Sequence, residues 1–455
     1  MIGRGLNSLR FSVLPRIWRR EGPFPPRTVL MVFAINAGSK VGGFIREVYI
    51  SSLYGVSNVT DAFFAVQQIP LFVSNYMFGA FNLVFIPGYA SAKQEKMSWS
   101  FLKTLLKILV SVGLALTALM FVGAHEWVPR IVGVAGQAGG LAGDFAMILC
   151  LSIVPIILVG LGYGMFHAER QHAKAMLMDA LFWFAMLVGL VGLALVSEAN
   201  VAYALPWSFV IGAFVAAGCT TYLARRLIRS DPTPPPQKRR VEGPFLKGFF
   251  KQLSASSAEN VGFNLNQLLN VFFAGITGSG SVAVYAYATR LAMLPLSGIV
   301  NPLAQMIQAW LSSDETPESR GKHFALVALA MLLMVMLIAL LLIAFREPLV
   351  RFVYQRGEFS ASDTLRVSWL LVPYACYFAV ISLNQLFGRY FFVLSRGGLY
   401  TTSLLAGYLV SNLLKPFLAT SMGVSGIIWA CVIGEGLALL SLVARFVWEE
   451  ALPSW

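Results

Sequence analysis

The segment FALVALAMLLMVMLIALLLIAF, at residues 324–345, contains no polar or charged side chain. A helix of roughly 20 apolar residues is long enough to cross the hydrocarbon core of a bilayer. The same character extends over the whole chain, because 57% of its 455 residues are hydrophobic and 12% are charged. The mean hydropathy is +0.71. Soluble domains carry about 25% charged residues, so the composition excludes a soluble enzyme or DNA-binding protein and predicts a polytopic membrane protein.

Apolar stretches of this length recur about twelve times along the sequence. They form two equal groups on either side of DPTPPPQKRR (231–240), whose prolines favour a stiff, extended linker. The expected fold is all-α, with about twelve transmembrane helices in two six-helix lobes and the substrate in a central cavity between them. The expected divisions are a basic tail at 1–27, an N-lobe at 28–224, a linker at 225–245, a C-lobe at 246–447 and a C-terminal tail at 448–455.

The positions of Lys and Arg account for the net charge of +13. These residues cluster before the first span and after spans two, four, six, eight and ten, whereas the opposite loops at 54–60, 197–200, 275–281 and 421–423 contain none. This is the positive-inside pattern, so both termini are expected to be cytoplasmic. One loop departs from it, with Arg346, Arg351, Arg356 and Arg366. The charge therefore indicates membrane topology and contacts with anionic lipid, and not binding of nucleic acid.

The sequence lacks a recognisable catalytic set. Its four His residues are scattered, and no GxSxG, HExxH or Walker motif is present. The four Cys residues lie within apolar spans without CxxC spacing, which argues against a disulfide or zinc site. We therefore expect a transporter without a cofactor or metal, driven by an ion gradient or the membrane potential, with the coupling ion left open.

Ionisable side chains inside the apolar spans are the clearest functional signal, because a charge at membrane depth costs about 3 kcal/mol or more. Lys40, Arg46 and Glu47 lie in the first span, Asp61 opens the second, and Arg290 lies deep in the eighth. Arginine binds phosphate oxygens in bidentate fashion, so this excess of cations predicts a phosphate or diphosphate held by Arg46 and Arg290, with Lys40 assisting. Glu47 and Asp61 are expected to orient the cations or to form a gate.

The seventh span, at 246–275, is the most polar. Asn260, Asn264 and Gln267 follow one another at i, i+4 and i+7, with Glu259 on a neighbouring stripe. Two interpretations stay open: these residues line a polar cavity, or the amides form hydrogen bonds between packed helices, each worth about 1 kcal/mol.

Several motifs in one order resemble a known family. SKVGGFIRE (39–47), TDAFF (60–64), YATRL (287–291) and QRGEF (355–359) are similar to the corresponding segments of the lipid II flippases, the MurJ or MviN family of the multidrug/oligosaccharidyl-lipid/polysaccharide exporter superfamily. The resemblance implies two six-helix lobes around a cavity. It also implies movement of undecaprenyl-diphosphate-linked saccharides across the bacterial inner membrane by alternating access, by a monomer.

The resemblance also assigns residues. Arg46 and Arg290 match cavity arginines that hold the diphosphate in the family, and Asp61 matches the aspartate of its Asp-Ala-Phe motif. Three departures are evident: Lys40 replaces an arginine, Ser74 and Asn75 stand where second-helix arginines are usual, and two further C-terminal helices are not expected here. The glycan thus stays open between lipid II and an exopolysaccharide or O-antigen repeat unit.

Two other functional classes stay open from the residues alone. An ion-coupled antiporter of small molecules on the same fold would need acidic residues in the cavity, for which Glu259 and Glu435 are the candidates. A non-transporting scaffold for envelope synthesis would tolerate neutralisation of all the intramembrane cations.

Overall fold

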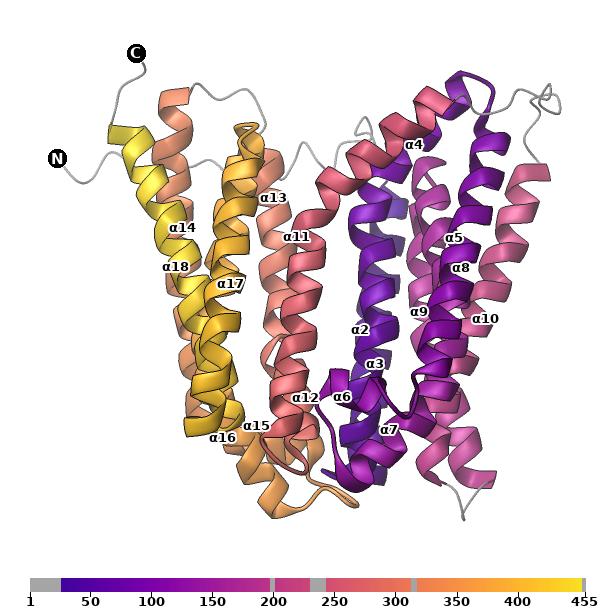
Figure 1. Ribbon diagram of the computed structural model, residues 1–455. Helices are drawn as coiled ribbons and strands as arrows, with labels where there is room; N and C mark the ends of the chain where they lie inside the picture. The colour runs from indigo at the N-terminus through magenta and orange to yellow at the C-terminus, as the bar shows by residue number, and fades with distance from the viewer. Residues whose placement is uncertain (1–25, 197–200, 230–242, 312–316, 452–455) are drawn as a thin grey trace.

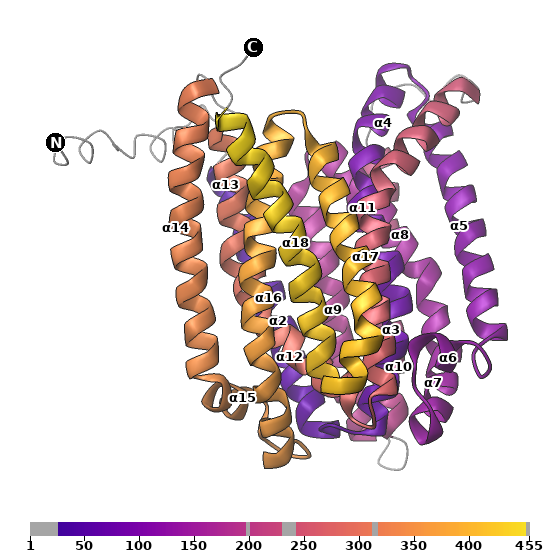
Figure 2. The ribbon, with the colours of Figure 1, turned by 60° about the vertical axis from the view of Figure 1, so that its left-hand side comes forward.

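A computed structural model describes residues 26–196, 201–229, 243–311 and 317–451, and within these ranges the chain is helical without β-strands (Figure 1). The helices lie side by side in two bundles. In Figure 1 the bundle from the first half of the chain is indigo to magenta and the other is mostly orange to yellow; Figure 2 shows the molecule from a second side. We refer to helices α2–α10 as the N-lobe and to helices α11–α18 as the C-lobe. The prediction of an all-α fold with two lobes is confirmed.

The N-lobe comprises helices α2 (Pro26–Tyr54), α3 (Asn58–Tyr76), α4 (Asn82–Gln94), α5 (Ser98–Val122), α6 (Val128–Val132), α7 (Gly136–Leu149), α8 (Ile153–Ala168), α9 (His172–Val196) and α10 (Val201–Arg229). The C-lobe comprises helices α11 (Gly243–Ile276), α12 (Ser281–Ala292), α13 (Asn301–Leu311), α14 (Pro317–Ala344), α15 (Arg346–Tyr354), α16 (Ala361–Val393), α17 (Gly397–Met422) and α18 (Val424–Ala451).

Each of the twelve predicted spans coincides with one helix or with two consecutive helices. Among the described residues, nine helical segments are long and apolar enough to cross a membrane. The predicted spans that fall outside this set correspond to α2, α11 and α17. By length and composition these nine segments are candidate membrane crossings, and the count of twelve stays a prediction.

The second span of each lobe is interrupted in the same way. A π-helical turn at Met77–Phe81 separates α3 from α4, and another at Leu296–Val300 separates α12 from α13. A proline lies on the N-terminal side of each turn: Pro70 is inside α3, seven residues before the first turn, and Pro295 directly precedes the second. Such turns widen a helix locally and often occur at functional sites. The positions of the two turns, each in the second span of its lobe, support an internal repeat between the lobes.

Helix α11 joins the two lobes along much of its length. In Figure 1 it runs from the end of the molecule that carries α15, here called the α15 end, toward α4 at the opposite end, here called the α4 end. The Tyr76 hydroxyl of α3 lies 3.0 Å from the Ser257 hydroxyl of α11. Farther toward the α4 end, the Phe249 ring packs edge-on against Phe81 and Phe101 of the N-lobe. The helix therefore positions the lobes relative to one another.

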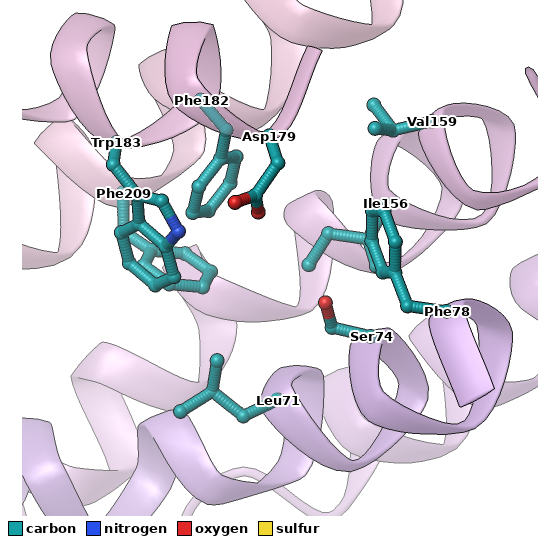
Figure 3. A pocket seen from close by; sticks show the side chains of 9 residues that line it. All are labelled: Leu71, Ser74, Phe78, Ile156, Val159, Asp179, Phe182, Trp183 and Phe209. Carbon is teal, nitrogen blue, oxygen red and sulfur yellow. The ribbon is translucent and has the colours of Figure 1, made fainter. Parts of the chain in front are cut away.

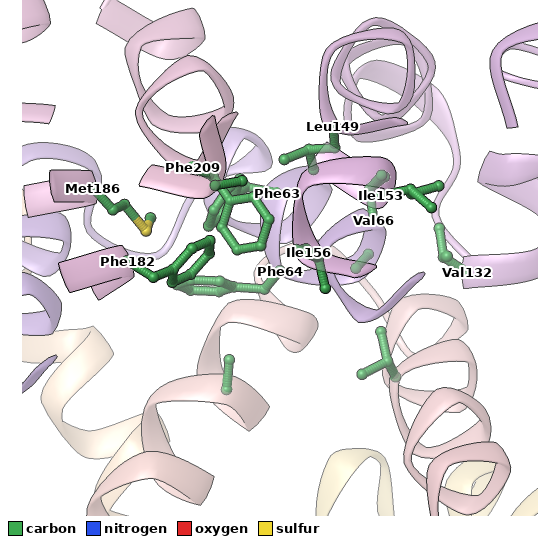
Figure 4. Packing of buried hydrophobic residues seen from close by; sticks show 14 of the residues in the cluster. Phe63, Phe64, Val66, Val132, Leu149, Ile153, Ile156, Phe182, Met186 and Phe209 are labelled. Carbon is green, nitrogen blue, oxygen red and sulfur yellow. The ribbon is translucent and has the colours of Figure 1, made fainter. Parts of the chain in front are cut away.

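Aromatic side chains fill the N-lobe between α3, α9 and α10 (Figure 4). Phe209 makes edge-on contacts with Phe63 and Phe182, at centroid distances of 6.4 and 5.1 Å. All three rings are buried. Such pairs add about 0.5–1.5 kcal/mol each beyond the burial of apolar area. The cluster fixes α9 beside α3 and so determines the surroundings of the candidate site.

In the C-lobe, α17 and α18 approach so closely that their contact admits only glycine. A Cβ atom added at Gly407 would lie 2.6 Å from the carbonyl oxygen of Gly434, and one added at Gly434 would lie 2.3 Å from the carbonyl oxygen of Gly407. Small residues let membrane helices pack backbone to backbone, where van der Waals contact replaces the missing hydrophobic driving force.

We expect Gly434→Leu to lower the stability of the folded protein by about 1–3 kcal/mol, because the added side chain forces α17 away from α18. Gly436→Leu is the matched control, since a Cβ atom there meets nothing within 4 Å. Thermal unfolding in detergent measures both variants. Equal unfolding midpoints for the two variants would contradict the proposed packing.

Candidate functional site

The carboxylate of Glu47, in α2, connects the two lobes. Arg46 donates from Nε to Glu47 Oε1 at 3.1 Å and also from Nη2 to the same oxygen. Arg290 of α12 donates from Nη1 to the other oxygen, Oε2. Arg46 and Glu47 belong to the N-lobe and Arg290 belongs to the C-lobe, so one carboxylate bridges two arginines across the lobe interface.

Aromatic rings and soft acceptors surround the two guanidinium groups. The Cζ atom of Arg46 lies 4.1 Å from the centroid of the Trp183 ring, and its Nη1 is 3.8 Å from the sulfur of Met186. The Cζ atom of Arg290 lies 4.1 Å from the centroid of the Phe64 ring. Cations over aromatic faces gain about 2 kcal/mol when they are desolvated. The rings therefore help to keep both arginines charged within the membrane.

The site is partly open and holds charges of both signs. Two guanidinium groups face the Glu47 carboxylate, and the charge of Asp179 on α9 also acts on Arg46. Arg290 makes a further contact, from Nη2 to the neutral amide oxygen Oε1 of Gln67 at 3.4 Å. The side chains of Arg46 and Glu47 are 10% and 7% exposed, whereas that of Arg290 is 26% exposed. An oxyanion such as a phosphate suits this arrangement, because it can take the position that the Glu47 carboxylate holds.

Asp61 ties α3 to the first turn of α12. Its two carboxylate oxygens accept hydrogen bonds from the backbone N–H groups of Gly280 and Ala283, the latter at 2.8 Å. The N-cap residue of α12 is Gly280, which provides no side-chain cap of its own. Asp61 thus caps the N-terminus of a helix in the other lobe, where its negative charge complements the helix dipole. The hydrogen bonds of the Asp61 carboxylate thus go to the backbone of α12, while its role stays a prediction.

Further contacts close the lobes at the α15 end. The Ser279 hydroxyl donates to Asn58 Oδ1 at 3.0 Å, which joins the C-lobe to the N-lobe next to Asp61. The Glu358 N–H donates to the carbonyl oxygen of Ser52 at 3.0 Å. Gly357, the residue before Glu358, has a φ of +58°. It packs closely on Ser52, since a Cβ atom added at Gly357 would lie 2.1 Å from the carbonyl oxygen of Ser52. The α15 end is therefore shut in this conformation.

The amides of α11 take part in contacts between the lobes. Asn75 of α3 donates to Asn264 Oδ1 at 2.9 Å, and Asn260 donates to the carbonyl oxygen of Asn75 at 3.4 Å. Gln267 instead has its partners within the C-lobe: it accepts from Asn270 of the same helix at 2.9 Å and from Tyr285 of α12 at 3.3 Å. For these residues the geometry fits the interhelical hydrogen bonds that the sequence left open as one interpretation.

The acidic candidates for an antiporter are already paired. Glu259 accepts from the Thr401 hydroxyl of α17 at 3.4 Å. Glu435 is fully buried, and its carboxylate accepts from Tyr377 at 3.0 Å and from Asn384 at 3.1 Å. Lys415, on the neighbouring helix α17, is also fully buried, with its ammonium 2.6 Å from Asn266 Oδ1. Glu435 and Lys415 therefore belong to the packing inside the C-lobe.

Two further residues bear on the site: Lys40, which the sequence predicted as a ligand, and Asp179, which the sequence analysis did not identify. The backbone of Lys40 is part of α2, but its side chain lies outside the described part of the chain. Asp179, on α9, was not identified from the sequence. It faces a cavity of about 20 Å³ together with Ser74 and Trp183 (Figure 3), and this volume suffices for a water molecule. As a lone carboxylate in the apolar span at 175–196, it would have been found by the criterion that identified Arg290.

Comparison with known proteins adds independent evidence. The sequence model of the family described as "Lipid II flippase MurJ" matches residues 50–447. The lipid II flippase MurJ of Burkholderia cenocepacia is 25% identical over 455 residues, which cover 94% of this chain and 86% of the relative. Among solved structures, a lipid II flippase MurJ in an inward closed conformation has a TM-score of 0.77 at 19% identity, covering 93% of this chain and 90% of that one. An inward-facing multidrug transporter of the MATE family has a TM-score of 0.73 at 13% identity, with coverages of 93% and 97%.

The two solved structures establish the shared fold of the exporter superfamily, and the match of the family model establishes the narrower relationship. The sequence motifs that contain Arg46, Asp61 and Arg290 lie in the helices that meet at the lobe interface. The family model matches most of the 455 residues of this chain. The chain therefore belongs to the lipid II flippase MurJ family, within the multidrug/oligosaccharidyl-lipid/polysaccharide exporter superfamily.

Proposed function

We propose that this protein moves an undecaprenyl-diphosphate-linked saccharide from the cytoplasmic to the periplasmic leaflet of the bacterial inner membrane by alternating access. The observation that carries the proposal is the bridge from Arg46 through Glu47 to Arg290. It places two cations, linked by one carboxylate, at the junction of the lobes, where binding of an anion can be coupled to lobe movement.

The chemical step is an exchange of anions. The diphosphate of the substrate displaces the Glu47 carboxylate from Arg290 and then accepts bidentate bonds from both guanidinium groups. This exchange keeps both guanidinium groups paired with an anion, and the displaced Glu47 carboxylate must be hydrated or take up a proton, because an unpaired charge at membrane depth costs about 3 kcal/mol or more. At the end of the cycle, Glu47 returns to the arginines and displaces the diphosphate. No bond to phosphorus forms or breaks, so the protein acts as a transporter and not as an enzyme.

Release on the far side requires the α15 end to open. The bonds of Asp61 to the first turn of α12 and of Asn58 to Ser279 must then break. The positive-inside pattern supports a periplasmic α15 end and cytoplasmic termini, although Arg346, Arg351, Arg356 and Arg366 at the α15 end depart from it. The conformation described here, shut at the α15 end, then corresponds to a stage before release of the cargo. The names of the relatives make lipid II the first saccharide to test.

Transport by purified protein tests the function directly. We expect proteoliposomes to flip fluorescent lipid II, measured as the fraction that becomes accessible to a membrane-impermeant reductant. Arg290→Ala should slow flipping at least about tenfold, because charge-assisted hydrogen bonds contribute about 1.5–3 kcal/mol each. Arg346→Ala is the control, since that guanidinium stacks on Trp369 in the C-lobe, 4.2 Å from the ring centroid.

The same assay with a lipid-linked exopolysaccharide repeat unit decides between the two cargoes. Undiminished flipping by the Arg290→Ala variant would remove that arginine from the mechanism. If the wild-type protein moved neither lipid, under conditions in which a known family member is active, the proposed function would be wrong.

The exchange of anions predicts opposite effects on binding and transport for Glu47→Gln. Removing the competing carboxylate should tighten the binding of inorganic diphosphate about tenfold, while flipping slows because the carboxylate can no longer displace the bound anion. Calorimetry in detergent measures the first effect and the proteoliposome assay measures the second. Glu358→Gln, at an exposed position, should change neither. Weaker binding of diphosphate by the Glu47 variant would contradict the exchange.

Opening of the α15 end can be tested by cross-linking Asn58 to Ser279, whose side-chain oxygens are 3.0 Å apart across the lobes. In a background without the native cysteines, Asn58→Cys/Ser279→Cys should lose flipping on oxidation and regain it on reduction. The pair Asn58→Cys/Gln137→Cys joins two residues of the N-lobe, whose side chains are also 3.0 Å apart, and should stay active when cross-linked. Full activity of the oxidised inter-lobe pair would exclude alternating access through this end.

A further inference from the structure

A second feature of the N-lobe faces away from the lobe interface. A groove of about 610 Å³ lies between α5, α8 and α10. In Figure 1 these three helices are on the side of the N-lobe away from α14–α18. Its lining includes Leu114 of α5, Leu158 of α8 and three residues of α10: Phe214, Tyr222 and Arg225. The groove shares none of its lining residues with the bridge of Arg46, Glu47 and Arg290.

The inner wall of the groove is apolar although it contains hydroxyl groups. The Thr117 hydroxyl donates to the carbonyl oxygen of Cys150 at 3.2 Å, and the Thr221 hydroxyl donates to the carbonyl oxygen of Ala217 at 2.7 Å. Both threonines therefore direct their polar atoms toward the backbone. Leu114 and Phe214, which are 57% and 55% exposed, lie on membrane-spanning helices. Hydrocarbon is the medium that this wall fits.

The spacing along α10 gives the groove its direction. Phe214, Gly218, Tyr222 and Arg225 follow one another at intervals of four, four and three residues, so they form one stripe on the helix. A Cβ atom at Gly218 would meet nothing within 4 Å, and the groove is open at this point because the residue is glycine. From Phe214 to Arg225 the helix rises about 16 Å. This is about half of a hydrocarbon core of about 30 Å, or the depth of one leaflet.

The charged end of the stripe identifies the occupant. Arg225 lines the groove at the C-terminal end of α10, and Arg226 and Arg229 are exposed in the last turns of the same helix. The distribution of charges in the sequence places this end in the cytoplasm. Anionic lipids are characteristic of the cytoplasmic leaflet, and guanidinium groups match phosphate oxygens in geometry and charge.

We propose that the groove between α5, α8 and α10 binds one anionic phospholipid of the cytoplasmic leaflet. Its phosphate lies on Arg225, and an acyl chain follows the stripe past Tyr222 and Gly218 to Phe214. Such a lipid would join α5 to α8 and α10 and stabilise the N-lobe, because a ligand that binds only the folded state stabilises it by mass action. The proposal concerns lipid binding and does not depend on the transported cargo.

Native mass spectrometry of the delipidated protein, with phosphatidylglycerol and phosphatidylcholine added separately, tests this site. We expect one phosphatidylglycerol to bind with at least tenfold preference over phosphatidylcholine and to raise the midpoint of thermal unfolding. Gly218→Trp should abolish both effects by filling the groove, and Arg225→Gln should abolish the preference for the anionic lipid. Equal binding of both lipids by the wild-type protein would overturn the proposal.

Two control variants separate the groove from general effects. Gly192→Trp places the same side chain at an exposed position of α9 where a Cβ atom also meets nothing within 4 Å. Arg229→Gln removes a neighbouring charge that does not line the groove. Both should bind phosphatidylglycerol as the wild type does. Binding that survives Gly218→Trp, or undecaprenyl phosphate outcompeting phosphatidylglycerol at this site, would refute the assignment, whether or not the protein flips lipid II.

Discussion

The structure depends on keeping charges paired at membrane depth. Glu47 alone, or either arginine alone, would cost several kcal/mol in a medium that cannot solvate it. Placed together, Arg46, Glu47 and Arg290 compensate one another, and the rings of Trp183 and Phe64 cover the guanidinium faces. Because the arginines come from different lobes, the requirement for pairing also holds the lobes together. The same requirement makes the contact responsive to an anion, since only another anion can replace the carboxylate without leaving the two guanidinium groups unpaired.

The contacts between the lobes differ in strength along the molecule. At the α15 end they are directional, with Asp61 bonded to the backbone of α12 and Ser279 bonded to Asn58. Toward the α4 end, the ring of Phe249 packs against Phe81 and Phe101 without hydrogen bonds between the rings. Hydrogen bonds require a fixed geometry, whereas contacts between apolar rings tolerate a range of arrangements. This difference suits a protein that opens one end while α11 stays in contact with the N-lobe.

The sequence predicted the helices well because the bilayer imposes a length and an apolar composition that each span shows by itself. It also identified Arg46, Glu47 and Arg290 as charges that need partners. It could not pair them, because the contact between Glu47 and Arg290 joins residues 243 positions apart and follows from the packing of whole helices. The amides of α11 show the same limit, since their spacing predicted one polar face but not that Asn75 of α3 would meet it. Asp179 was missed although its isolation in an apolar span signalled it.

The departures from the family pattern on the second helix, Ser74 and Asn75, have one physical consequence: they reduce the positive charge at the lobe interface. Where second-helix arginines are usual, this chain has Ser74 beside the cavity of Asp179 and Asn75 bonded to Asn264 of α11. Those positions therefore contribute neutral contacts between helices in place of positive charge. With fewer cations, the affinity for a diphosphate depends more strongly on how readily Glu47 gives up its two arginines. Such a site binds an anion by exchanging it for the Glu47 carboxylate, and not through an excess of free positive charge. Glu47 therefore determines both how tightly the cargo is bound and how readily it is released.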